Sequence, residues 1–174
     1  KKEVELKDYP LPPKQQIAAL YFVDFPDAKQ SVIRIGNLSL AYTDQDYYPA
    51  TVMNYKLGGS FSGNVNLILR EEKGYTYGAR TAFNGSLYPG YFAATASVNS
   101  SATLESVQIF VDEMNKYREG VPSSDLEFTR NALVRSNARA FETLGALRGM
   151  LNSIATYNLP FDYVKQREDF VRNF

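Results

Sequence analysis

The residues best suited to chemistry in this sequence are an arginine and a tyrosine, Arg70 and Tyr77, which stand seven positions apart. A guanidinium presents several hydrogen-bond donors in a rigid fork, and a phenol adds one more. If the two groups converge, they can hold a carbonyl, a carboxylate or a developing oxyanion. The structural alternative is that Arg70 pairs with a nearby carboxylate while Tyr77 packs on a sheet. The two residues alone leave both interpretations open.

A second candidate site lies just upstream, in the stretch Leu57-Gly-Gly-Ser60 ahead of a predicted helix. Backbone N–H groups at a helix start can bind an anion, so Gly58, Gly59 and Ser60 are candidate loop contacts. Together with Arg70 they could hold a small anion. The Lys-Ser or Lys-Thr ending of a nucleotide phosphate loop is missing, so nucleotide binding is not expected. A helix stop followed by a helix cap explains the same residues without any ligand.

The composition excludes several classes of site. Lysine plus arginine and aspartate plus glutamate both number 19, so no net field attracts nucleic acid or an anionic membrane. The sequence contains no histidine and no cysteine, which rules out a Ser-His-Asp triad, a Cys-His dyad and a histidine-ligated zinc within these residues. No apolar run is long enough to span a bilayer. We therefore expect neither a metal site nor a self-contained hydrolase in this segment.

The elements that position Arg70 and Tyr77 can be predicted from patterning. Residues 1–16 form a predicted extended lead-in, in which Pro10-Leu-Pro-Pro13 is either a linker or a proline-rich ligand for an aromatic groove. Residues 17–174 are predicted to form a single domain. Runs of β-branched and aromatic residues bounded by turn residues predict four strands, at Ile17–Phe25, Ser31–Tyr42, Tyr75–Phe83 and Tyr91–Val98.

A predicted helix carries Arg70. Ser60 or Ser62 can cap its start, and Gly74 is its predicted stop. Glycine at this place can adopt a left-handed conformation, which folds the following strand back past the helix end. Tyr77 lies on that strand, so this reversal would bring the tyrosine toward the arginine.

Helical periodicity also predicts a helix over residues 43–56 and several helices after residue 103. A capping box at Ser124 and Glu127 opens a long predicted helix that reaches Leu144. The helix before it has a predicted apolar stripe consisting of Leu104, Val107, Val111 and Met114. Four strands, two of them adjacent as a hairpin, together with these helices predict an α+β two-layer sandwich. In this fold class a mostly antiparallel sheet carries helices on one face.

Two motifs at a fixed spacing resemble a known family. Leu57-Gly-Gly-Ser-Phe-Ser62 followed by Leu69-Arg-Glu-Glu-Lys-Gly-Tyr-Thr-Tyr-Gly78 is similar to the second half of a structural unit in the pitrilysin-like (insulinase, M16) zinc metallopeptidases. Gly63-Asn-Val65 departs from the family, which commonly has Ser-Arg-Leu there. The resemblance implies that the segment is part of a longer chain and lacks a final strand. Other similar stretches are Gln30-Ser-Val-Ile-Arg-Ile-Gly36, Asp46-Tyr-Tyr-Pro-Ala-Thr-Val-Met-Asn54 and Gly90-Tyr-Phe92.

The resemblance implies a clam-shaped peptidase in which two homologous halves enclose a chamber. One half carries the zinc motif His-x-x-Glu-His, and the other lacks it but supplies an arginine and a tyrosine, seven residues apart, that reach the substrate. Arg70 and Tyr77 match this pair in identity and spacing. The resemblance therefore implies a non-catalytic half-domain, inactive alone, that grips peptide substrate while zinc is bound by a homologous domain of the same chain or of a partner subunit.

A non-proteolytic scaffold or peptide-binding subunit of the same architecture is the alternative. Some relatives serve as assembly subunits, and a fold does not determine a function. A parent sequence without His-x-x-Glu-His would favour this alternative. Together with the lack of cysteine, the resemblance favours a bacterial cell-envelope setting.

Overall fold

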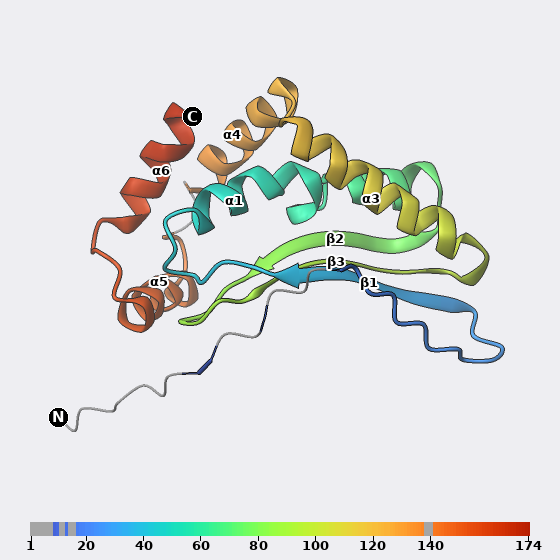
Figure 1. Cartoon of the computed structure of the whole chain (residues 1–174). Coiled ribbons are helices and arrows are strands. Elements are labelled where there is room, and N and C mark those ends of the chain that lie inside the picture. The colour runs from blue at the N-terminus through green and yellow to red at the C-terminus, as the bar shows by residue number, and fades with distance from the viewer. Residues whose placement is uncertain (1–8, 11–12, 14–16, 138–140) are drawn as a thin grey trace.

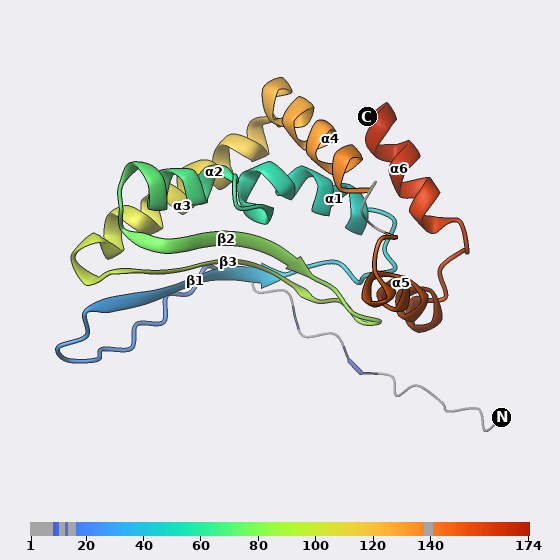
Figure 2. The same cartoon turned by 180° about the vertical axis from the view of Figure 1, so that it is seen from behind.

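The computed structural model describes residues 9–10, 13, 17–137 and 141–174. Its framework is a three-stranded antiparallel sheet in the order β1-β3-β2. Helices lie over one face of this sheet, and no described helix covers the other face (Figures 1 and 2). The predicted α+β class with helices on one face is confirmed. The strands are β1 (Gln30–Leu38), β2 (Thr76–Asn84) and β3 (Tyr91–Asn99).

The helical layer combines short and long pieces. α1 (Tyr47–Asn54) continues as a π-helical turn over Tyr55–Gly59, and the single turn α2 (Asn64–Asn66) continues as another over Leu67–Glu72. A 3-10 turn, Ser100–Ala102, leads from β3 into the later helices. These are α3 (Thr103–Glu119), α4 (Ser123–Asn137), α5 (Leu144–Tyr157) and α6 (Tyr163–Asn173).

The hydrophobic core lies between the helical layer and the sheet. Val65 and Leu69 from the helical segment after residue 63, Phe110 from α3 and Val98 from β3 are fully buried in one cluster. Full burial of a side chain of this size stabilises the folded state by roughly 1.5–3 kcal/mol. Because Leu69 is anchored in this cluster, the neighbouring Arg70 projects from a firmly packed element.

The predicted first strand, Ile17–Phe25, is not part of the sheet. Leu20 is 93% exposed and Val23 is 87% exposed. β1 pairs with β3 alone among the described strands. A β-branched and aromatic pattern indicates a preference for a pleated surface, but a strand also needs a partner backbone. The prediction of four strands is therefore wrong for the described residues, in which three form.

The predicted apolar stripe of α3 is confirmed in part, because Val107 and Met114 are partly buried against the core. Leu104, which the apolar pattern placed in the core, is 82% exposed. Glu113 is buried instead, and its carboxylate forms an ion pair with Lys116. A periodicity search that weighs only apolar residues cannot find a stripe that contains serine and glutamate. The buried positions of α3 are Ser106, Phe110, Glu113 and Tyr117.

Three predicted helix boundaries are also wrong. Gly63, not a serine, occupies the N-cap position of α2. The Leu126 N–H donates to the Pro122 carbonyl at 3.0 Å, so α4 starts ahead of the predicted cap Ser124. The predicted long helix is interrupted, because α5 begins as a separate helix at Leu144. Capping signals of one or two polar residues recur throughout a sequence, and tertiary contacts decide which of them are used.

The predicted lead-in over residues 1–16 lies largely outside the described residues. The boundary between residues 16 and 17 and the proposed absence of a final strand stay predictions. Within the described residues, no helix is long and apolar enough to cross a membrane.

Candidate functional site

Arg70 and Tyr77 lie on either side of a tight turn. Arg70 belongs to the π-helical turn after α2, and Tyr77 is the second residue of β2. Between them Gly74 has a φ of 66°, a left-handed conformation that glycine adopts without steric cost. The Gly74 N–H donates to the Arg70 carbonyl at 3.2 Å, and the Tyr75 N–H donates to the Leu69 carbonyl at 2.8 Å. The predicted chain reversal at Gly74 is confirmed.

A β-bulge places the Tyr77 side chain on the open side of the sheet. Thr76 pairs with Val98 and Ala79 pairs with Ala96, so β2 has one more residue than β3 between these pairs. Thr76 and Ala79 are consequently both buried, while Tyr77 is 90% exposed. The Tyr77 phenol has no hydrogen-bond partner among the described residues. This exposure does not fit the structural alternative in which Tyr77 packs on the sheet.

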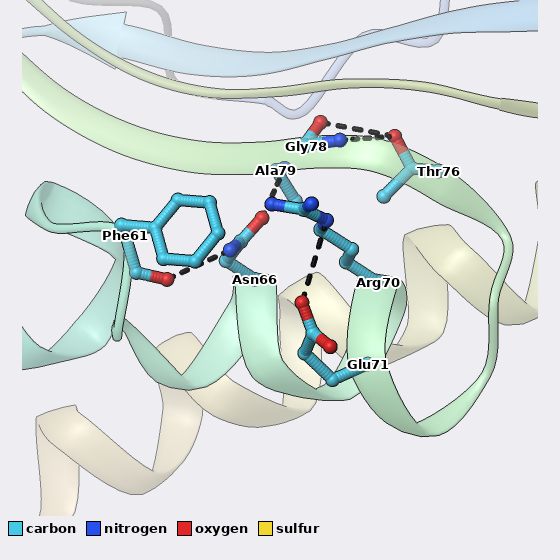
Figure 3. Close-up of polar contacts among 7 residues, drawn as sticks. All are labelled: Phe61, Asn66, Arg70, Glu71, Thr76, Gly78 and Ala79. Atoms are coloured by element: carbon cyan, nitrogen blue, oxygen red, sulfur yellow. Dashed lines mark hydrogen bonds and ion pairs between the residues drawn. The ribbon is translucent and has the colours of Figure 1, made fainter.

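Asn66 joins the helical segment of Arg70 to the strand of Tyr77 (Figure 3). Its side-chain carbonyl accepts a hydrogen bond from the Ala79 N–H at 2.9 Å, and its amide donates to the Phe61 carbonyl at 2.7 Å. Asn66 is only 3% exposed, so water does not compete for either bond. Such bonds contribute about 1 kcal/mol each to stability. They hold the bulge and the helical segment in one relative position.

The Arg70 side chain rests on an aromatic ring and keeps free donors (Figure 3). Its guanidinium carbon lies 4.6 Å from the centroid of the Phe61 ring, which is a cation–π contact. Its Nε atom lies 3.4 Å from Oε1 of Glu71, and because both side chains are partly exposed this ion pair is weak. No other hydrogen bond or ion pair involves this guanidinium in the described part of the chain. The predicted carboxylate partner is present, but the terminal amino groups of Arg70 stay available.

Arg70 and Tyr77 line the same surface cleft, which has a volume of about 570 Å³ and which Gly74 also lines. Tyr77 also lines a neighbouring cleft of about 530 Å³. The candidate contacts Gly58, Gly59 and Ser60, followed by Phe61, line that second cleft. Tyr77 therefore lines both clefts, the one that contains Arg70 and the one that contains the candidate loop contacts.

The glycine loop has a packing role that is visible in the structure. Gly58 is buried, and a Cβ atom added there would lie 2.6 Å from Oγ1 of Thr81, so no larger residue fits against β2 at this position. The Ser60 hydroxyl oxygen is buried without a hydrogen-bond partner among the described residues. The use of Gly58, Gly59 and Ser60 as substrate contacts stays a prediction.

Glu105 of α3 binds the turn that separates Arg70 from Tyr77. Lys73 Nζ donates to its Oε1 at 2.7 Å, and the Tyr75 phenol donates to its Oε2 at 2.7 Å. The hydrogen bonds from Lys73 and Tyr75 lower the pKa of Glu105, and the same bonds raise the pKa of each donor. Lys73 and Glu105 are 41% and 48% exposed, so solvent weakens the ion pair between them. Glu105 therefore contributes more to the position of the turn than to global stability.

Sequence reasoning missed Asn66 and Glu105, and it included Phe61 only as part of a motif. An asparagine inside a helical segment is unfavourable by propensity, and this is a signal that its side chain has a local hydrogen-bonding role. No comparable signal exists for Glu105, because nothing in the local spacing relates residue 105 to the turn at residues 73–75.

Among the described residues there is no group of three or more histidine, cysteine, aspartate or glutamate side chains placed to hold a metal ion. The sequence has no histidine and no cysteine at all. These residues do not fit zinc, and no step of a zinc reaction is assigned to them.

Comparisons with known proteins place the chain in a structural context. A family model described as the peptidase M16 inactive domain matches residues 1–133. A solved peptidase M16 inactive domain from Pseudomonas fluorescens is similar to 86% of this chain and 36% of its own, with 22% identity and a TM-score of 0.77. A protease from Helicobacter pylori is similar to 86% of this chain and 37% of its own, with 12% identity and a TM-score of 0.72.

The periplasmic protease PqqL from Escherichia coli is similar to 85% of this chain and 17% of its own, with 13% identity and a TM-score of 0.63. At these identities the solved structures show the fold alone. This chain spans little more than a third of the Pseudomonas and Helicobacter chains. No curated protein matches it significantly in sequence.

Proposed function

This chain belongs to the peptidase M16 inactive-domain family, and we propose that it is the non-catalytic half-domain of a zinc endopeptidase. In this proposal Arg70 and Tyr77 grip the peptide substrate opposite a zinc site on another domain. One observation carries the proposal: Arg70 and Tyr77 line one cleft, and among the described residues neither side chain uses all of its donors. The family match supports the setting, and the cleft supports the role of the two residues.

The two side chains suit a peptide carbonyl that becomes negatively charged during hydrolysis. Arg70 offers the N–H groups of its terminal amino nitrogens, and Tyr77 offers its phenol O–H, so an oxygen between them can accept from both. The Phe61 ring and the Asn66 bonds hold the donors in place before the substrate arrives. Donors that are already positioned need little reorganisation in the transition state.

Zinc, which the family resemblance implies for a partner domain, would supply Lewis-acid activation of water there. The part of the present chain is to bind the extended peptide, to orient its carbonyl and to stabilise the oxygen from the opposite side. The weak pair between Arg70 and Glu71 allows the arginine to exchange its carboxylate neighbour for substrate. By itself the chain is expected to cleave nothing.

Steady-state kinetics of the complete peptidase, with the partner half present, test the proposal. Arg70→Ala and Tyr77→Phe should each lower kcat/KM by roughly 10²–10³-fold, which is typical for the loss of one oxyanion donor. Matched controls are Arg135→Ala, on the exposed side of α4, and Tyr91→Phe, 54% exposed on β3 and outside both clefts. Unchanged kcat and KM in the Arg70 and Tyr77 variants would overturn the role assigned to them.

The scaffold alternative makes a different prediction in the same experiment. A scaffold or peptide-binding subunit without proteolysis requires that no partner half carries His-x-x-Glu-His and that the assembled protein cleaves no peptide. Loss of assembly in the Arg70 and Tyr77 variants, measured by size-exclusion chromatography, would then favour a structural role for the pair.

A further inference from the structure

Two arginines face each other across the open side of the sheet. Arg34 of β1 and Arg80 of β2 are both directly opposite Thr95 of β3, which lies between them. Both are exposed, whereas their neighbours along each strand, Ile33 and Ala79, are buried. The two guanidiniums therefore project from one row of the sheet on the face that no described helix covers.

The spacing of the strands allows both arginines to reach one ligand. Neighbouring strands lie roughly 4.8 Å apart, so the backbones of Arg34 and Arg80 are separated by about 10 Å, with the small side chain of Thr95 between them. An arginine side chain is long and flexible enough to cover half of that separation. Both side chains, together with Tyr77, line the cleft of about 530 Å³ described above.

Neither arginine has a charged partner of its own. No ion pair or hydrogen bond involves the Arg34 or Arg80 side chain in the part of the chain that the structure describes. The residues that line the cleft include no aspartate and no glutamate. The chain as a whole is neutral, with 19 basic and 19 acidic residues, so this unpaired positive charge is a local feature.

We propose that Arg34 and Arg80 form a carboxylate-recognising subsite, which binds either an acidic side chain or the C-terminal carboxylate of a peptide held in the cleft. The proposal rests on the proposed function, because it takes the peptide gripped by Tyr77 as the ligand. Two guanidiniums suit a carboxylate, whose two oxygens can each accept charge-assisted hydrogen bonds. Since Tyr77 lines this cleft and also the one with Arg70, a single extended peptide can contact all four side chains.

Two exposed arginines on edge strands also have an explanation that involves no ligand. β1 and β2 are both edge strands of the sheet, and exposed charges on edge strands discourage aggregation. Arginines that only prevent aggregation would not make peptide affinity depend on the sequence of the peptide. A carboxylate subsite makes binding depend on one negative charge of the peptide and on both arginines together.

Binding of fluorescently labelled peptides to the complete protein tests the subsite without any cleavage. The probes are alanine-based peptides that carry one glutamate, moved through successive positions. Each is paired with a glutamine counterpart and with a C-terminally amidated form. At one position we expect the glutamate peptide to bind about three- to tenfold more tightly than the glutamine peptide at low salt, as fluorescence anisotropy measures. If the glutamate and glutamine peptides bind equally and amidation weakens both, the recognised group is the C-terminal carboxylate.

The variant Arg34→Gln/Arg80→Gln should abolish the dependence of affinity on the recognised carboxylate, so that the charged peptide and its uncharged counterpart bind alike. The matched control Arg135→Gln/Arg148→Gln removes the same charge from exposed positions on α4 and α5 and should retain the preference. Equal binding of the glutamate, glutamine and C-terminally amidated peptides by the wild type would overturn the proposal, as would an unaltered preference in the Arg34/Arg80 variant. Because anisotropy does not require cleavage, this outcome is separate from failure of the Arg70 and Tyr77 variants to change kcat/KM.

Discussion

The side-chain carbonyl of Asn66 accepts a hydrogen bond from the Ala79 N–H at 2.9 Å, across the junction between helix and sheet. This bond connects the segment that carries Arg70 with the bulged strand that carries Tyr77. Ala79 is the first residue after the bulge that returns to the buried face of β2. The relative position of the two proposed substrate-binding groups therefore depends on a third, uncharged side chain, that of Asn66.

Asn66→Ala should lower the free energy of unfolding by about 1–3 kcal/mol, because it leaves the buried Ala79 N–H without a partner. Asn84→Ala is the control, since Asn84 is exposed and its side-chain bond to Ala82 is long, at 3.4 Å. That change should stay within roughly 0.5 kcal/mol. Urea denaturation followed by circular dichroism measures both, and equal midpoints for the two variants would contradict the role of Asn66.

Phe61→Ala should weaken substrate turnover with little loss of stability. The ring is 67% exposed, so its removal costs little packing, but Arg70 loses the surface on which its guanidinium rests. An exposed cation–π contact is worth roughly 0.5–1 kcal/mol, so kcat/KM should fall by about two- to fivefold. The control Phe161→Ala removes a ring that is 91% exposed and lies outside both clefts. A similar fall in the control would remove the support for this contact.

Gly74→Ala and Gly149→Ala should have opposite effects on stability. At both positions a Cβ atom would meet no other atom within 4 Å, so sterics are matched. At Gly74, with a φ of 66°, alanine is forced into the left-handed region and should cost about 1–2 kcal/mol. Gly149 lies inside α5, where alanine should add about 0.5–1 kcal/mol. Thermal unfolding measures both, and a stabilising Gly74→Ala would contradict the strained turn.

The hydrogen bonds that Glu105 accepts from Lys73 and Tyr75, here called the Glu105 clamp, predict that stability depends on pH in both the acidic and the alkaline range. Hydrogen bonds from Lys73 and Tyr75 lower the pKa of Glu105 below its ordinary 4.5. Its contribution is therefore complete above about that pH and is lost as the pH falls through the lower native pKa. The pKa of Tyr75 is raised above 10.0 and that of Lys73 above 10.5, chiefly by the hydrogen bond to Glu105. Their contributions are complete below those values and are lost as the pH rises through the native pKa.

Glu105→Gln should remove part of this dependence on the acid side. Urea midpoints of the wild type and the variant, measured from pH 3 to pH 7, should converge toward the acid end and separate toward neutral pH. Glu119→Gln is the control, because Glu119 is exposed and forms no ion pair among the described residues. A constant difference between wild type and Glu105→Gln over this range would contradict the clamp.

Local sequence patterns predicted the turn and the hairpin that carry Arg70 and Tyr77 better than they predicted which other segments join the sheet and the core. The hairpin of β2 and β3 and the stop at Gly74 follow from short-range preferences, such as the left-handed freedom of glycine and the two-residue period of strands. The strand predicted at Ile17–Phe25 does not form, and Leu104 is exposed although Val107 and Met114 of the same predicted stripe pack against the core, because burial depends on which elements meet. One sequence does not contain that information in its local periodicity.

The sequence by itself determined the family, the α+β class, and the identity and spacing of Arg70 and Tyr77. Only the tertiary structure decided that the bulge in β2 exposes Tyr77, that Tyr77 and Arg70 line one cleft, that Glu105 holds the turn, and that Arg34 and Arg80 share one row. The physical reason is that residue types and spacings are local properties of a chain. A bulge, a buried amide partner and a cross-strand row exist only once segments distant in the sequence are packed against one another.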